Sequence, residues 1–137
     1  MDAVHPRPAA AGLTLTIGYN LPKGWGTVFA VSIDEATLHE IVRRLVEAVD
    51  PDRIVMFGSR ARGDARPDSD LDLLIIKDSI EPRHRRAIPA YYALAGLGIP
   101  TDILWRTAAE IAEWARVPNH VTTRAIREGK VLYERAT

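Results

Sequence analysis

The sequence predicts a small α/β fold of the α+β type, in which a mixed β-sheet is backed by helices on one side. Three observations lead to this prediction. Segments with helical spacing of apolar residues alternate with short β-branched runs, turn residues separate them, and the order is helix, strand, strand, helix, strand, helix, helix. At 137 residues, the chain is long enough for one compact domain with a modest core.

The first helix is predicted to follow Ser32. Ser32 and Glu35 have the spacing of a capping box, and apolar residues then recur at helical spacing at Leu38, Ile41, Val42, Leu45 and Val49. The turn at residues 50–52 ends this helix. Residues 53–57 form a β-branched run, which predicts a strand that leads into Gly58.

The middle of the chain predicts two more strands and a helix. Residues 71–76 are almost continuously apolar, which is typical of a strand with both faces covered. Residues 82–95 are expected to be helical in spite of Pro89, and residues 101–105 to form the third strand.

The last third predicts two helices and a short strand. Thr107 and Glu110 form a second candidate capping box, which opens a helix through about Arg116. A further helix is expected to end near Gly129, and residues 131–133 are a candidate final strand.

The first 30 residues differ from the rest in composition. They hold few charges and several prolines, so we expect residues 1–30 to form a poorly ordered extension or a short hairpin. Candidate strand residues here are Thr14, Thr16, Val28, Phe29 and Val31. The functional domain is expected to span residues 31–137.

Composition narrows the functional classes. Lys plus Arg equals Asp plus Glu at 18 each, so direct nucleic-acid binding is not expected. The chain has no cysteine, which excludes disulfides and thiolate chemistry. It also has no apolar run long enough to span a membrane and no recognisable secretion signal, so we expect a cytoplasmic protein.

One motif carries most of the chemical information. Gly58-Ser59 is followed by ten residues and then by Asp70 and Asp72, separated by one residue. Because side chains alternate along a strand, the two carboxylates are expected to project the same way. Paired carboxylates suit Mg²⁺, whose remaining ligands are commonly water and substrate phosphates. The Gly58–Gly63 spacing is not a P-loop, because Asp64 stands where lysine would be required.

This Gly-Ser and Asp-x-Asp pattern, with its flanking apolar strands, resembles the minimal nucleotidyltransferases of the DNA polymerase β superfamily. The resemblance covers roughly residues 31–137 and implies a polymerase-β-like nucleotidyltransferase fold that uses Mg²⁺ and ATP. It implies that Gly58 and Ser59 hold the triphosphate and that Asp70 and Asp72 ligate the metal. Asp102, on a later strand, is the matching position for a third carboxylate that completes the metal site or accepts a proton.

Basic residues are candidates for further contacts. Arg60, Arg62 and Arg66 lie between the turn and the carboxylates, where they either contact phosphates or form a solvated loop. The basic segment 83–86 is either the exposed side of a helix or a surface for an acidic or nucleic-acid partner. Tyr91 and Tyr92 are expected to be packing residues.

The resemblance extends to a biological role. Nucleotidyltransferases of this size resemble the antitoxins of prokaryotic pairs whose toxin is a helical HEPN ribonuclease, and the implied activity is transfer of AMP from ATP to a toxin tyrosine. Two alternatives stay open: a small-molecule, antibiotic-type nucleotidyltransferase, and a non-catalytic antitoxin that acts by binding. The expected assemblies are a hetero-oligomer with the toxin or a homo-oligomer.

Overall fold

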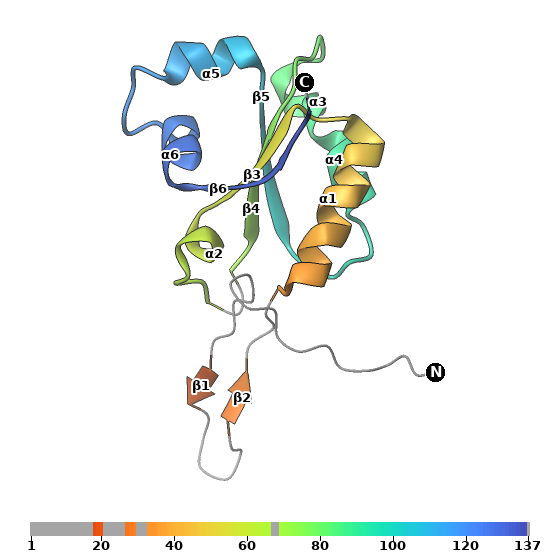
Figure 1. Ribbon diagram of the computed structural model, residues 1–137, viewed down its shortest axis with the longest axis vertical. Helices are drawn as coiled ribbons and strands as arrows, with labels where there is room; N and C mark the ends of the chain where they lie inside the picture. The colour runs from red at the N-terminus through yellow and green to blue at the C-terminus, as the bar shows by residue number, and fades with distance from the viewer. Residues whose placement is uncertain (1–17, 21–26, 30–32, 67–68, 137) are drawn as a thin grey trace.

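The computed structural model describes residues 18–20, 27–29, 33–66 and 69–136. Its main sheet has four strands in the order β5-β4-β3-β6 (Figure 1). The strands are β3 (Arg53–Phe57), β4 (Leu71–Ile76), β5 (Thr101–Arg106) and β6 (Lys130–Glu134). Strand β3 is antiparallel to both β4 and β6, whereas β4 and β5 are parallel. The predicted mixed sheet and α+β class are therefore confirmed.

Helices cover both faces of this sheet, so the prediction of helices on one side only was wrong. Helices α1 (Glu35–Val49) and α4 (Ile88–Ala93) lie on one face, and α5 (Ala108–Trp114) and α6 (Val121–Glu128) lie on the other (Figure 1). The alternation of side chains along β4 explains why helices are needed on both faces. Leu71, Leu73 and Ile75 pack into the core beneath α1, whereas Leu74 and Ile76 pack into a second cluster that includes Ala125 of α6.

Helix α1 begins later than the sequence predicted. Its N-cap is Asp34, whose Oδ1 accepts a hydrogen bond from the Thr37 amide at 2.8 Å. The predicted cap, Ser32, lies outside the described residues, and the helix starts only at Glu35. The capping box proposed for Ser32 and Glu35 was therefore wrong.

The helix predicted over residues 82–95 is divided in two. Helix α3 (Arg83–Arg86) ends at Ala87, and α4 then begins with Pro89 in its first turn. Proline lacks the amide donor that a continuous helix needs, and its ring would clash with the carbonyl four residues earlier in such a helix. The break therefore follows from the proline that the prediction had tolerated.

Other predicted features are confirmed. The Thr107–Glu110 capping box has both of its hydrogen bonds, and Gly129 caps α6.

A separate two-stranded sheet pairs β1 (Gly18–Asn20) with β2 (Thr27–Phe29), whereas Thr14, Thr16 and Val31 lie outside the described residues. Among the described residues, no helix has the length and apolar character needed to cross a membrane.

Candidate active site

The three predicted carboxylates lie at the same end of the sheet. Asp72 is the second residue of β4, where it pairs with Phe57 at the end of β3 and lies beside Asp102 of β5. Asp70 lies one residue before β4 begins. The parallel alignment of β4 and β5 therefore brings the most distant carboxylate in the sequence next to the Asp-x-Asp pair.

The charged groups around Asp72 shift the pKa of its carboxyl group. Burial raises the pKa of the Asp72 carboxyl above its ordinary value, and the neighbouring carboxylates of Asp102 and Asp70 raise it further. The guanidinium groups of Arg62 and Arg60 oppose this rise. A cation at this position would relieve the repulsion between the carboxylates, so the site favours binding of a positive charge.

Gly58 brings the turn after β3 against Asp72. Its φ of +76° and ψ of −160° lie in a region that is essentially restricted to glycine. A β-carbon on Gly58 would overlap Asp72 Oδ2 and would lie 3.1 Å from Asp72 Cγ. Glycine is therefore needed both for the backbone conformation and for the space that the carboxylate occupies.

The two arginines of the short helix α2 (Ser59–Arg62) have different environments. Arg60 is only 3% exposed and donates from Nε and Nη2 to the Ser69 carbonyl, at 3.2 and 2.7 Å. This contact holds the loop directly before Asp70. Arg62 is exposed, with Nε 3.4 Å from Asp64 Oδ2. Phosphate contacts by Arg60 and Arg62 stay predictions, and Arg62 has the more accessible side chain.

A tyrosine from α4 approaches the third carboxylate. The Tyr91 hydroxyl accepts a hydrogen bond from the Ile103 amide at 2.8 Å and donates to Asp102 Oδ1 over a longer distance of 3.5 Å. Because β5 is an edge strand, Tyr91 satisfies an edge amide in addition to contacting Asp102. The prediction of a packing residue missed this polar role.

The donor set is compatible with Mg²⁺ shared between protein and substrate. Within the described residues, no group of three or more acidic, histidine or cysteine side chains is arranged to hold a metal ion by itself. Mg²⁺ commonly uses only one or two carboxylates and takes its other ligands from water and substrate phosphates. Asp70 and Asp72 offer such carboxylates, with Asp102 beside them.

Sequence reasoning also missed the contribution of α6. Arg124 and Glu128 line a pocket together with Phe57, Gly58 and Arg62. Arg124 and Glu128 are four residues apart, so the sequence does indicate that they share one face of a helix. That this face lies beside the Gly58 turn depends on how α6 packs over β3, which local spacing does not reveal.

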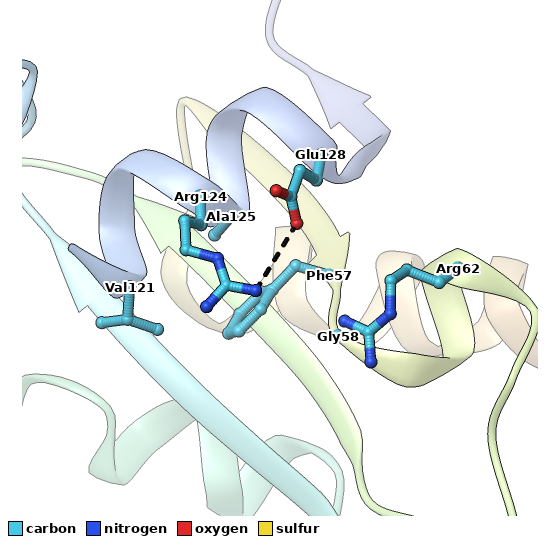
Figure 2. A pocket seen from close by; sticks show the side chains of 7 residues that line it. All are labelled: Phe57, Gly58, Arg62, Val121, Arg124, Ala125 and Glu128. Carbon is cyan, nitrogen blue, oxygen red and sulfur yellow. Dashed lines mark ion pairs between the residues drawn. The ribbon is translucent and has the colours of Figure 1, made fainter. Parts of the chain in front are cut away.

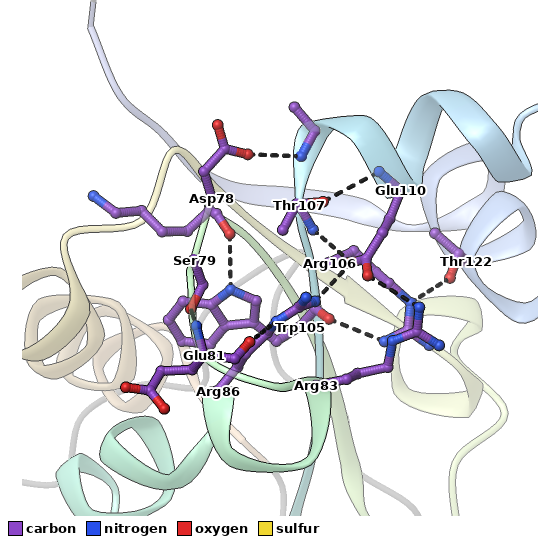
Figure 3. A network of polar contacts seen from close by, with 12 residues as sticks. Asp78, Ser79, Glu81, Arg83, Arg86, Trp105, Arg106, Thr107, Glu110 and Thr122 are labelled. Atoms are coloured by element: carbon purple, nitrogen blue, oxygen red, sulfur yellow. Dashed lines mark hydrogen bonds and ion pairs between the residues drawn. The ribbon is translucent and has the colours of Figure 1, made fainter.

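A polar network away from the carboxylates joins α3 to α5 (Figure 3). Glu110 accepts hydrogen bonds from Arg86 Nη1 at 2.7 Å and from Arg83 Nη2 at 3.0 Å. Burial alone would raise the pKa of Glu110, but hydrogen bonds from Arg86, Thr107 and Arg83 outweigh burial and lower this pKa to about 2. Arg83 and Arg86 of the basic segment are therefore engaged within the chain, whereas His84 and Arg85 are exposed.

Replacing Glu110 by glutamine is expected to destabilise the fold by about 1–2 kcal/mol at neutral pH, because the charge that pairs with Arg83 and Arg86 is lost. With a folded pKa of about 2 and an ordinary value of 4.5, this contribution is complete above pH 4.5 and disappears as the pH falls toward 2. Urea unfolding should therefore show a smaller difference between the two proteins at about pH 3 than at about pH 7.

The matched control is Glu113→Gln, an exposed position on the same helix. This variant should change the free energy of unfolding by less than about 0.5 kcal/mol. A loss in Glu110→Gln that is equal at both pH values would show that charge pairing is not its cause.

Comparison with known proteins identifies the class. A family model for the nucleotidyltransferase domain matches residues 36–131, which is more than half of the chain. The chain therefore belongs to the nucleotidyltransferase domain family, and the resemblance carried by the Gly-Ser and Asp-x-Asp pattern is confirmed at that level. No curated protein sequence gives a significant match.

Three solved structures share the fold. A protein of Sulfolobus solfataricus assigned as a nucleotidyltransferase is 22% identical, with a TM-score of 0.50 and coverage of 72% of this chain and 78% of that chain. A mutant of the toxin–antitoxin MntA-HpeT is 16% identical, with a TM-score of 0.51 and coverage of 72% and 73%. A toxin–antitoxin structure with AMP-PNP is 18% identical, with a TM-score of 0.50 and the same coverage. At these identities the likeness concerns the fold alone.

Proposed function

We propose that this nucleotidyltransferase is an antitoxin that transfers AMP from ATP, with Mg²⁺, to a tyrosine of a helical HEPN ribonuclease toxin. The observation that carries the proposal is the convergence of Asp70, Asp72 and Asp102 at the end of the sheet where the Gly58 turn meets Asp72. The shared fold of the toxin–antitoxin MntA-HpeT and of a toxin–antitoxin structure with AMP-PNP supports the choice of partner and nucleotide.

The proposed reaction forms one P–O bond and breaks another. The tyrosine hydroxyl oxygen attacks the α-phosphorus, the bond from this phosphorus to the bridging β-phosphate oxygen breaks, and pyrophosphate leaves. Asp102 accepts the hydroxyl proton, and Gly58 and Ser59 hold the triphosphate through backbone amides and a hydroxyl. Asp70 and Asp72 would hold Mg²⁺, which would supply positive charge to neutralise the phosphates.

The test is intact-protein and peptide mass spectrometry of a HEPN toxin encoded beside this protein, after incubation of the two proteins with ATP and Mg²⁺. The expected result is an AMP adduct on a toxin tyrosine, because a metal held by the carboxylates would orient the nucleotide for attack by an external hydroxyl. The double variant Asp70→Asn/Asp72→Asn should form no adduct.

Complex formation is measured in parallel, by size-exclusion chromatography of both versions with the toxin. If both bind tightly and neither forms an adduct, neutralisation by binding replaces catalysis as the function. If a small-molecule acceptor is modified and the toxin is not, the fold performs the same chemistry on another substrate.

A further inference from the structure

A pocket of about 170 Å³ lies between α6 and the Gly58 turn (Figure 2). Phe57 and Gly58 contribute to it from the end of β3, Arg62 from α2, and Arg124 and Glu128 from α6. The arginine side chains come from two different helices, and Figure 2 shows Arg62 beside Gly58 and Arg124 beside the Phe57 ring. The pocket therefore combines two cations at the position where the candidate triphosphate-binding turn begins.

Among the residues that the structure describes, neither cation has an ionic partner at the usual distance of a charge-assisted hydrogen bond. The Nε of Arg62 is 3.4 Å from Asp64 Oδ2, and the Nη2 of Arg124 is 3.9 Å from Glu128 Oε1. Charge-assisted hydrogen bonds between arginine and a carboxylate are usually about 2.7–2.9 Å long. Both arginine side chains are also about half exposed, so an anion entering the pocket can compete for their donors.

The pocket lies on the opposite side of Asp72 from Asp102. Strand β5, which carries Asp102, is on one side of β4, whereas β3 and the turn at Gly58 are on the other. In phosphoryl transfer the attacking and leaving oxygens lie roughly in line through the phosphorus. If the acceptor hydroxyl meets its base at Asp102, the leaving group departs toward Gly58 and the pocket.

Resting on the proposed function, with Arg62 already a predicted phosphate contact, we infer that Arg124 of α6 joins it at the β- and γ-phosphates of the nucleotide and then at the pyrophosphate leaving group. Arg62 reaches the phosphates from α2, and Arg124 reaches them from α6, a helix outside the Gly-Ser and Asp-x-Asp motif. Glu128 holds Arg124 weakly at the pocket until the phosphates displace it. Arginine suits this role because its planar fork of donors can bind two phosphate oxygens at once.

The test measures binding to the full chain by calorimetry, with the Mg²⁺ complexes of ATP, AMP and pyrophosphate as separate ligands. Arg124→Ala should weaken ATP and pyrophosphate about tenfold, because a charge-assisted contact to the terminal phosphates is lost. Its affinity for AMP, which lacks those phosphates, should not change. Arg124→Lys should lie between the two proteins for ATP, because it keeps the charge and loses the fork.

The matched control is Arg127→Ala, an exposed arginine on the same helix that does not line the pocket. It should bind all three ligands like the unmodified chain, and thermal unfolding should show that both alanine variants are folded. Unchanged ATP affinity in Arg124→Ala, or an equal loss for AMP, would overturn the inference while leaving the proposed function intact. Failure of the unmodified chain to bind ATP would overturn both.

Discussion

Replacing Asp72 by asparagine is expected to reduce the rate of nucleotidyl transfer by about 10³-fold or more, since a charge that faces the reacting phosphates is removed. The same change should abolish the stabilisation given by ATP with Mg²⁺, which amounts to about 2.7 kcal/mol at a ligand concentration 100 times Kd. Transfer is measured on the proposed toxin partner by mass spectrometry over time, and stabilisation is measured by thermal unfolding.

The stability of the ligand-free Asp72→Asn protein distinguishes loss of the active site from loss of the fold. Burial and the carboxylates of Asp102 and Asp70 raise the pKa of Asp72, so the ionised form is disfavoured in the folded chain. A neutral asparagine removes this repulsion, and the ligand-free Asp72→Asn protein should unfold at the same temperature as the unmodified chain or higher. Replacement of the exposed Glu113 by glutamine should change neither the transfer rate nor the unfolding temperature. If the Asp72→Asn protein is folded and keeps its transfer rate, Asp72 is not part of the active site.

Replacing Gly58 by alanine is expected to destabilise the fold by about 2–4 kcal/mol and to abolish nucleotide binding. Two effects add at this position. The backbone conformation at φ +76° and ψ −160° is strained for any residue with a side chain. In addition, the new methyl group would overlap Asp72 Oδ2 and push that carboxylate away from its neighbours. Urea unfolding and calorimetry with ATP and Mg²⁺ measure the two consequences.

Gly63→Ala separates backbone strain from displacement of the carboxylate. Gly63 also has a positive φ, of +85°, but among the described residues nothing beyond its adjacent backbone lies within 4 Å of the position that a β-carbon would take. This variant should lose only about 1 kcal/mol of stability and should keep its affinity for the nucleotide. Equal nucleotide binding by Gly58→Ala and Gly63→Ala would show that the contact between Gly58 and Asp72 is unimportant for the site.

Local sequence patterns predicted the individual elements well. The strands β3 and β4 have their predicted bounds, and β5 extends one residue further than predicted. The Thr107–Glu110 pair forms the expected capping box. These features depend on neighbours within a few residues, such as β-branched runs or a hydroxyl three positions before a glutamate, so the sequence alone contains the information.

Which face of the sheet each helix covers was harder to predict. The nearly continuous apolar run from Leu71 to Ile76 correctly indicated a strand covered on both faces, yet the order of elements led us to expect helices on one side. Which face each connection crosses depends on packing between distant segments. Ala125 of α6 packs against the face that carries Leu74, and no local pattern near either residue specifies this pairing.

The candidate site was predictable where it depends on spacing. The spacing of two residues predicted that Asp70 and Asp72 lie near each other, and the Asp70 charge does act on Asp72. The parallel pairing of β4 with β5 places Asp102 beside Asp72. The overlap between Gly58 and the Asp72 carboxylate, the contact of Tyr91 with Asp102 and the position of Arg124 were not predictable. Each of these joins residues from different elements, and only the folded chain brings them together.

The most direct test of nucleotidyl transfer by this chain follows the fate of each phosphate of ATP. The protein and the proposed HEPN toxin partner are incubated with Mg²⁺ and with ATP that carries a radioactive label at either the α- or the γ-phosphate. We expect the α-label to appear on the toxin and the γ-label to appear in pyrophosphate, with both lost in Asp70→Asn/Asp72→Asn. Transfer of the γ-label to the toxin, or release of neither label in the presence of a stable complex, would contradict the account.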